Sequence, residues 1–318
     1  MWPTPDLPKK MLKGRDEEVM LCGHCLQGCL ARVKEGKGIG CNVNPRVGHE
    51  LDRVMPAAQP KHVVIVGGGP AGMQAALTAH QRGHRVTLFE KKRLGGQFAL
   101  AFLPPGKERI GQPLLSLTAK VERSGIDLRL EQEATVEKLK ALEPDAVIIA
   151  TGSRPAIPDI PGLDDPITAE EVLTGIRETG DRVLILGGGM VGMEIAEFLA
   201  KRDKQCVVIE ILDDVVQDMN PVSRKLIMKR LASLPVEIHT STKLEHMEDQ
   251  QAVVTHLDEQ RVLGQFDSVV VTVGNRPYDP LSEDLIREGM VVEIVGDSEK
   301  PAKVYDAVNS GHRAAMAI

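Results

Sequence analysis

The sequence has few aromatic residues and no long apolar run, and these shortages exclude several classes of protein. Phe, Trp and Tyr make up 3% of the 318 residues, so the core has to be mainly aliphatic. No stretch reaches the roughly 18 apolar residues of a membrane span, and the start of the chain lacks the apolar region of a signal peptide. The longest basic run is Lys91-Lys92-Arg93, and the formal net charge is −6. We therefore expect a cytoplasmic protein that contacts neither membrane nor nucleic acid.

The overall composition is that of a globular protein. Hydrophobic residues make up 42% of the chain and charged residues 26%, which is enough apolar material to bury a core. The length corresponds to about two domains on the usual scale of roughly 100 to 200 residues each. Glycine is abundant, with 30 residues, and this indicates many places where backbone must approach another group closely.

Cysteine is concentrated in one place. Cys22, Cys25, Cys29 and Cys41 lie within 20 residues, whereas Cys206 stands alone and is predicted to be a small buried residue at a strand. Without a secretory signal, clustered cysteines are typical of metal or cluster ligands rather than of disulfides. The spacing C-x2-C-x3-C-x11-C can surround a tetrahedral zinc or a cubane iron–sulfur cluster. We favour the cluster, because the gap of three differs from the paired C-x2-C pattern of structural zinc, and zinc remains the alternative.

A dinucleotide-binding fingerprint follows the first predicted strand, residues 62–66. Gly67, Gly69 and Gly72 form G-x-G-x-x-G between this strand and a helical pattern. In this context the glycines permit a tight turn, a close approach to a pyrophosphate and close packing of helix on strand. The next strand ends at Glu90, 23 residues after Gly67, where a carboxylate can bind an adenosine ribose.

The same pattern occurs a second time. Gly187, Gly189 and Gly192 follow another aliphatic strand and precede a helix, and Glu210 ends the next strand. One such motif alone can be an ordinary glycine turn, but two in the same strand and helix context strongly indicate two nucleotide sites. Glu210 would repel a 2′-phosphate, and the residues after it offer no Arg to attract one. The sequence therefore predicts NADH in preference to NADPH.

Three further strand ends are candidate cofactor contacts. Gly152 and Gly274 each follow a short aliphatic strand, in Ala-Thr-Gly and Val-Gly-Asn-Arg-Pro, where the chain could cross between domains. Each of the two could equally be an ordinary turn. Gly296-Asp297 comes between a strand and the terminal helix, a position that suits the ribityl chain of a flavin. A plain helix N-cap is the alternative for Asp297.

These motifs together resemble a known family. The chain resembles the C-terminal half of the 2,4-dienoyl-CoA reductase and trimethylamine dehydrogenase family. The resemblance is carried by the cysteine segment, which ends in CNVNP, and by five later motifs: VVIVGGGPAGMQAAL, FEKKRLGGQF, IIATGSRP, GGGMVGME and IVGDSEKP. This family contains NADH:flavin oxidoreductases with an old yellow enzyme-like barrel that carries FMN. The resemblance covers essentially the whole chain, and its cysteine motif is more specific than its glycine motifs. The chain has no counterpart of the barrel, so the resemblance implies a separate FMN subunit or an excised half.

The resemblance implies three sets of binding residues. The ligands of a [4Fe-4S] cluster would be Cys22, Cys25, Cys29 and Cys41. The FAD set would be Gly67, Gly69, Gly72, Glu90, Gly96, Gln97, Val136, Gly152 and Asp297. The NAD(H) set would be Gly187, Gly189, Gly192, Glu210 and Gly274. No catalytic acid or base is implied, because the family keeps its substrate-converting residues in the barrel.

Alternating strands and helices predict an α/β protein with two Rossmann-like dinucleotide-binding domains of the flavin reductase type. An N-terminal four-cysteine iron–sulfur segment over 1–57 precedes them. The FAD domain is expected over 58–175 and 278–318, with the NAD(H) domain inserted over 176–277. The absence of a C-x-x-C beside either glycine motif argues against thioredoxin reductase or glutathione reductase types.

The leading functional hypothesis is a flavin and iron–sulfur oxidoreductase. Electrons would pass from NADH through FAD to a [4Fe-4S] cluster and on to an FMN-containing partner, in a possible hetero-oligomer. The alternative is a module of an amine or N-methyl dehydrogenase that delivers electrons to an electron-transferring flavoprotein, with NADH unused. A third class is non-catalytic, a zinc-tethered nucleotide-binding scaffold or sensor.

Overall fold

The computed structural model describes residues 4–318 and divides them into two compact units. Unit 1 holds residues 4–102, 108–154 and 276–318, and unit 2 holds 103–107 and 155–275. The chain passes between the units through two short paired strands, β5 (Ser153–Pro155) and β14 (Asn275–Pro277). In the part of the chain that the structure describes, no helix is both long and apolar enough to cross a membrane.

Unit 1 is built on a five-stranded parallel sheet with the order β15-β4-β1-β2-β3. Its strands are β1 (His62–Val66), β2 (Arg85–Glu90), β3 (Asp127–Leu130), β4 (Ala146–Ile149) and β15 (Val292–Ile294). Its longer helices are α3 (Pro70–Gln81), α4 (Gly111–Glu122) and α10 (Val304–Ala317), and its shorter ones are α1 (Leu7–Leu12), α2 (Arg32–Lys34), α5 (Val136–Lys140) and α9 (Ser282–Arg287). This is the arrangement that short aliphatic strands alternating with helices predict.

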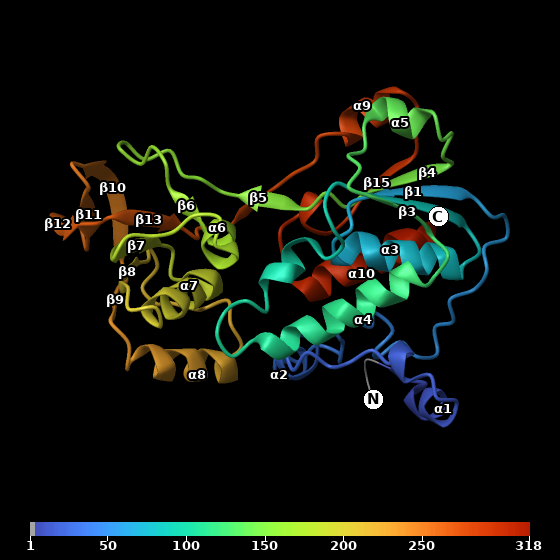
Figure 1. Cartoon of the computed structure of the whole chain (residues 1–318), viewed down its shortest axis with the longest axis horizontal. Helices are drawn as coiled ribbons and strands as arrows, with labels where there is room; N and C mark the ends of the chain where they lie inside the picture. The colour runs from blue at the N-terminus through green and yellow to red at the C-terminus, as the bar shows by residue number, and fades with distance from the viewer. Residues whose placement is uncertain (1–3) are drawn as a thin grey trace. The chain divides into compact units, whose positions relative to one another are not determined.

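The helices of unit 1 cover both faces of its sheet, because successive side chains of a strand point to opposite faces. Val63 and Ile65 of β1 belong to the core cluster that includes residues of α3, α4 and α10. Val64 and Val66 of the same strand belong to the cluster that includes residues of α5 and α9. Figure 1 shows α3, α4 and α10 below the sheet of this unit and α5 and α9 above it. With both faces buried, β1 consists entirely of buried residues.

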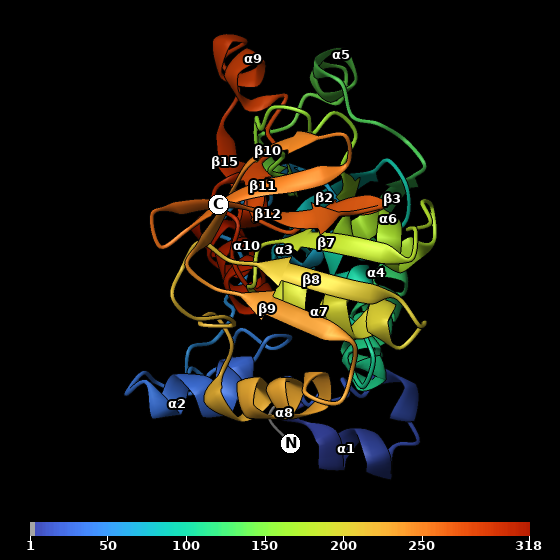
Figure 2. The same cartoon turned by 90° about the vertical axis from the view of Figure 1, so that its left-hand side faces the viewer.

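Unit 2 has a second parallel sheet with the order β6-β13-β7-β8-β9. Its strands are β6 (Ile167–Thr168), β7 (Arg182–Leu186), β8 (Gln205–Ile209), β9 (Val236–His239) and β13 (Ser268–Val271), and its helices are α6 (Ala169–Thr174), α7 (Met190–Ala200) and α8 (Pro221–Leu231). One face packs with the helices. The other packs against an antiparallel sheet of β10 (Thr242–Glu248), β11 (Gln251–His256) and β12 (Glu259–Gln265), visible in Figure 2.

The two Rossmann-like sheets predicted from the sequence are confirmed, but the change of unit lies elsewhere than the expected boundary. The chain enters unit 2 at Pro155, whereas the FAD domain is expected to run to residue 175. The physical reason is that β6 pairs in parallel with β13 and so completes the sheet of unit 2. Residues 103–107 also belong to unit 2.

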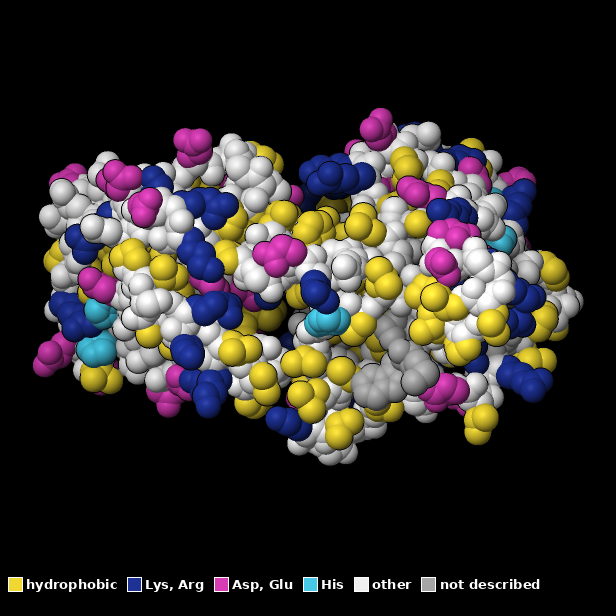
Figure 3. Space-filling view, turned by 60° about the horizontal axis from the view of Figure 1, so that its bottom comes forward, with side chains coloured by type: hydrophobic (Ala, Val, Ile, Leu, Met, Phe, Trp, Pro, Cys, Tyr) yellow, Lys and Arg dark blue, Asp and Glu magenta, His cyan; other side chains and the backbone are white. Residues whose placement is uncertain are grey.

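The N-terminal segment of unit 1, residues 4–57, exposes an unusual number of large apolar side chains. Leu12 is 88% exposed and Leu51 is 95% exposed. The exposed large apolar residues of this segment are Met11, Leu12, Leu21, Leu30, Val33, Leu51 and Met55. Figure 3 brings this face of unit 1 forward and shows hydrophobic side chains gathered on it. Apolar groups gathered in this way mark a surface that another molecule can cover.

Candidate cofactor sites

The first glycine loop has a shape that only glycine allows at two of its positions. Gly67 has a φ of +110°, and an added Cβ would lie 2.2 Å from the carbonyl oxygen of Ala150. An added Cβ on Gly72 would lie 1.9 Å from the carbonyl oxygen of Gly67. Gly69 differs, because no atom of the described residues lies within 4 Å of its Cβ position. The loop thus leaves open space at the N-terminus of α3, where a pyrophosphate would be bound.

Glu90 holds the glycine loop from the end of the neighbouring strand β2. Its carboxylate accepts hydrogen bonds from the backbone N–H of Gly68 at 2.8 Å and of Lys92 at 2.7 Å. An anionic carboxylate is therefore fixed beside the loop, where it could accept hydrogen bonds from a ribose. This is the position that the spacing from Gly67 predicts.

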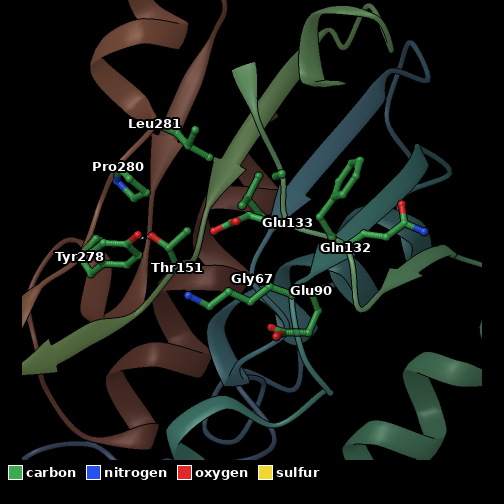
Figure 4. Close-up of a pocket in the computed structure, with 12 residues that line it drawn as sticks. Gly67, Glu90, Gln132, Glu133, Thr151, Tyr278, Pro280 and Leu281 are labelled. Atoms are coloured by element: carbon green, nitrogen blue, oxygen red, sulfur yellow. Dashed lines mark hydrogen bonds between the residues drawn. The ribbon is translucent and has the colours of Figure 1, made fainter. Parts of the chain in front are cut away.

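A pocket in unit 1 opens beside this carboxylate. Its lining residues are Val66, Gly67, Phe89, Glu90, Lys91, Gln132, Glu133, Ala134, Thr151, Tyr278, Pro280 and Leu281. Figure 4 shows Tyr278, Pro280 and Leu281 on one side and Gln132 on the other. The Thr151 hydroxyl donates to the carbonyl oxygen of Tyr278 at 2.5 Å. The pocket thus joins the glycine loop, the acid and the Ala-Thr-Gly turn at the carboxyl ends of β1, β2 and β4.

Val136 is not among the residues that line this pocket. It begins α5 and packs on the apolar cluster between the sheet and that helix. Ala134, two residues earlier, lines the pocket together with Gln132 and Glu133. Sequence reasoning did not single out Ala134, because its short run of polar neighbours has no motif of its own.

Gln97 and Asp297 of the predicted FAD set are linked through hydrogen bonds to Ser153. The Gln97 amide donates to the Ser153 carbonyl oxygen at 2.9 Å, and the Ser153 hydroxyl donates to Asp297 at 3.1 Å. Asp297 also accepts from the backbone N–H of Ala302 at 3.2 Å. Burial raises the pKa of Asp297, although these hydrogen bonds act in the opposite direction. A half-buried carboxyl group is thereby held between β15 and α10, at the same strand-end edge of the sheet.

Two further glycines of this set lie at the same edge. Gly96 has a φ of +52°, and an added Cβ would lie 3.1 Å from the Cα of Gly69. Gly152 has a φ of +82° and no neighbour within 4 Å of its Cβ position among the described atoms. Both therefore adopt backbone conformations that favour glycine. Gly96 lies tightly against the glycine loop, whereas Gly152 lies beside space that the described protein atoms leave open.

The glycine loop of unit 2 reproduces the first one. An added Cβ on Gly192 would lie 1.9 Å from the carbonyl oxygen of Gly187, which itself has a φ of +103°. Glu210 accepts from the backbone N–H of Gly188 at 2.6 Å and of Leu212 at 3.0 Å. Each loop is therefore held by a carboxylate in the same way. Gly274, before β14, has a φ of +103°.

One contact in this second loop was not foreseen from the sequence. The Asp218 carboxylate accepts a hydrogen bond from the backbone N–H of Met190, the first residue of α7, at 3.1 Å to Oδ1 and 3.3 Å to Oδ2. It lies 3.8 Å from the Cβ position of Gly189. Asp218 lies 28 residues after Met190, and no local sequence pattern indicates this contact.

The four clustered cysteines lie close enough to influence one another electrostatically. Burial raises the pKa of the Cys25 and Cys41 thiols, and neighbouring cysteines add to the rise in both. Backbone N–H groups point at the sulfurs, including a 3.4 Å hydrogen bond from His24 to Cys22. Such bonds stabilise thiolates, which are the ligands of iron–sulfur clusters. The donor set thus fits a cluster.

The backbone around these cysteines is tightly shaped. His24 and Leu26 both have positive φ, of 54° and 58°. An added Cβ on Gly28 would lie 2.9 Å from the Cα of Cys41, so the first and last parts of the motif are in direct contact. Over residues 4–318, no group of three or more His, Cys, Asp or Glu side chains has the arrangement of a site for a single metal ion.

Cys206 is separate from this group. It lies in β8, is 1% exposed, and belongs to the core cluster of unit 2. Burial raises the pKa of its thiol to about 12, so the thiol stays protonated near neutral pH. The prediction of a small buried residue at this position is confirmed.

Two parallel sheets, each with a glycine loop leading into a helix and an acid at the next strand end, define a nicotinamide-nucleotide-dependent flavoprotein oxidoreductase. Residues 61–295 match the family model of the pyridine nucleotide-disulphide oxidoreductases. The chain belongs to this family.

Relatives place the chain among enzymes of the predicted branch. It is 36% identical to an NADH oxidase of Thermoanaerobacter brockii and 35% identical to a bilirubin reductase of Mediterraneibacter gnavus, in each case over 99% of this chain and 50% of the relative. A solved 2-naphthoyl-CoA reductase is 32% identical, with a TM-score of 0.92 over 100% of this chain and 50% of that one. The chain thus spans about half the length of these relatives. The predicted resemblance to one half of the 2,4-dienoyl-CoA reductase and trimethylamine dehydrogenase family is confirmed.

Proposed function

We propose that the chain is an electron-transfer module that takes electrons from NADH and passes them through FAD and a [4Fe-4S] cluster to an FMN-containing partner. The observation that carries this proposal is the pair of glycine loops, one in each unit, each with its own carboxylate. When bound, FAD accepts two electrons from a nicotinamide and releases them singly, and a cluster carries one.

Unit 1 supplies the residues that would hold FAD. The open N-terminus of α3 offers backbone N–H groups and a partial positive charge to the pyrophosphate. Glu90 would bind the ribose, and Asp297 would bind the ribityl chain from the other end of the sheet edge. Gln97 and Ser153 keep Asp297 in place through their hydrogen bonds. All of these residues orient the cofactor, and none has to move a proton.

The apolar surface of the N-terminal segment supports a protein partner near the cysteines. Leu21 and Leu30 flank the first three cysteines and are both exposed, as are Leu12 and Leu51 elsewhere in the segment. A flavoprotein that covered this surface would exclude water from the neighbourhood of the cluster ligands. In our proposal this partner is the FMN protein, as a separate subunit or as another part of a longer chain.

We expect NADH to be preferred over NADPH by about tenfold or more in kcat/KM. A 2′-phosphate beside the Glu210 carboxylate would place like charges together, and a tenfold preference corresponds to a cost of about 1.4 kcal/mol. Glu210→Gln should reduce the preference several-fold, mainly by improving the use of NADPH. Glu259→Gln, which removes the same charge from the exposed strand β12, should leave it unchanged. A wild-type preference for NADPH would contradict the proposed role of Glu210.

The decisive test of the function is an absorbance spectrum of anaerobically purified protein before and after one equivalent of NADH. We expect flavin bands above a broad iron–sulfur shoulder, and we expect NADH to bleach both. A spectrum with a cluster but no response to NADH would contradict the proposal and favour the amine dehydrogenase alternative. Zinc without acid-labile sulfide would instead favour the non-catalytic class.

A further inference from the structure

The two glycine loops differ in their supply of backbone N–H groups at one position, the first residue of the helix that follows each of them. In α3 this residue is Pro70, which has no backbone N–H to donate. In α7 it is Met190, and its N–H donates to both oxygens of the Asp218 carboxylate. The backbone just before this residue is similar in both loops, because Gly69 and Gly189 have nearly the same φ, −75° and −69°.

The Asp218 carboxylate lies where a nucleotide pyrophosphate is expected in this fold. Backbone N–H groups at the start of the helix after a G-x-G-x-x-G loop bind the pyrophosphate, and the second glycine lets it approach the backbone. In unit 2 the Met190 N–H is already bonded to a carboxylate, and the space over Gly189 contains Asp218 Oδ2. In unit 1 the corresponding space over Gly69 contains no described protein atom.

The segment that carries this carboxylate is fixed on the glycine loop at one point. We call residues 211–219 the Asp218 loop. The Val216 N–H donates to the Gly188 carbonyl oxygen at 2.8 Å, and Val216 is 1% exposed with a φ of +51°. A β-branched residue is strained in this conformation, which marks a segment held in place by its surroundings. Beyond Val216, the loop residues Gln217 and Asp218 are exposed.

The Asp218 side chain is not enclosed by the core. Asp218 is itself exposed, and an open hollow beside the loop is lined by its neighbours Gln217 and Met219 and by residues of α8. A turn of the Asp218 side chain away from Met190 therefore needs no repacking of the core.

We propose that Asp218 occupies the pyrophosphate position of unit 2 in the nucleotide-free protein, and that a dinucleotide must displace it in order to bind. The inference rests on the proposed function, because it assigns a regulatory contact to the proposed NADH site. It has two consequences. The carboxylate lowers nucleotide affinity by competing for the Met190 N–H, and it keeps the helix N-terminus capped while the site is free.

The test is a calorimetric titration of the full chain with ADP-ribose, which carries the pyrophosphate but no redox group. Asp218→Ala should bind it about fivefold or more tightly than wild type, in line with the usual size of a capping interaction. Asp218→Asn keeps an oxygen acceptor without the charge, and its gain should be smaller. Asp213→Asn removes a charge from the same loop without touching Met190, and it should stay within about twofold of wild type. FAD content should be equal in all four proteins.

Other outcomes of the ADP-ribose titration would overturn the inference, the proposed function or both. Equal affinities in wild type and Asp218→Ala would overturn the displacement, and so would weaker binding by Asp218→Ala, which would make the carboxylate a support for the bound nucleotide. In both cases NADH could still reduce the flavin, and the proposed function would stand. If ADP-ribose bound to none of the proteins and NADH did not reduce the flavin, the proposed function would fail together with this inference. A thermal melt of each variant confirms that it is folded.

Discussion

Gly69→Ala is expected to fold like the wild type and yet to lose FAD affinity by roughly 100-fold or more, since a methyl group there would block the close approach of the pyrophosphate. Its φ of −75° suits alanine, and its Cβ position meets no atom of residues 4–318. The protein itself therefore tolerates the methyl group. The measurement is the dissociation constant of FAD, by titration of flavin-free protein, together with a thermal melt.

Variants of two other glycines serve as controls for Gly69→Ala. Gly72→Ala would place its Cβ 1.9 Å from the Gly67 carbonyl oxygen, so this variant should lose the fold of unit 1 as well as the flavin. Gly38→Ala adds a methyl group in open space outside the flavin site and should change neither property. Full flavin content in Gly69→Ala would show that the loop after β1 does not hold the pyrophosphate.

Cys29→Ser is expected to abolish the iron–sulfur cluster and with it the transfer of single electrons. Cys29 lies in the short π-helical turn Gln27–Ala31, between the first cysteines of the motif and Cys41. A serine at this position is a poor substitute for a thiolate, so iron and acid-labile sulfide should fall to a small fraction of the wild-type content. Electron delivery to an FMN partner or a one-electron acceptor should fall by about 100-fold, while NADH should still bleach the flavin.

The matched control for this experiment is Cys206→Ala. Cys206 is buried in β8 of unit 2, apart from the four cysteines of unit 1, so iron content should not change. Normal electron delivery by Cys29→Ser would show that the cluster is not the exit for electrons. Zinc in the wild-type protein, with no sulfide, would replace the cluster assignment.

Local patterns were sufficient to predict the glycine loops and their acids. The strand, the glycines and the acid lie within about 25 residues in each unit, and backbone sterics alone decide where glycine is needed. The turns that join β10 to β11 and β11 to β12 are equally local, because these strands pair in antiparallel order with their neighbours in sequence. These features depend on neighbours in sequence, which a single chain displays directly.

Long-range contacts could not be predicted in this way. The bond from Met190 to Asp218 joins a helix start to a loop after the next strand, and an exposed aspartate has no periodicity to reveal it. The start of unit 2 at Pro155 depends on the pairing of Ile167 with Val270, more than 100 residues later. The roles assigned to the cysteines and to Val136 stay predictions, because they were implied by the resemblance and depend on cofactors.

The path of the chain also affects the order in which the protein folds during synthesis. The sheet strands of unit 2 all lie within 155–275, whereas unit 1 still needs β15 and α10 from the last part of the chain. The last helix is indispensable to that core, since Gly311 packs so closely on α3 that an added Cβ would lie 2.1 Å from the Ala71 carbonyl oxygen. Unit 2 can therefore fold during synthesis before unit 1 does. Until β15 and α10 have been made, the apolar strands of the first part of unit 1 stay partly uncovered. Apolar surface that stays exposed in this interval is prone to aggregation, which is the condition that chaperones relieve.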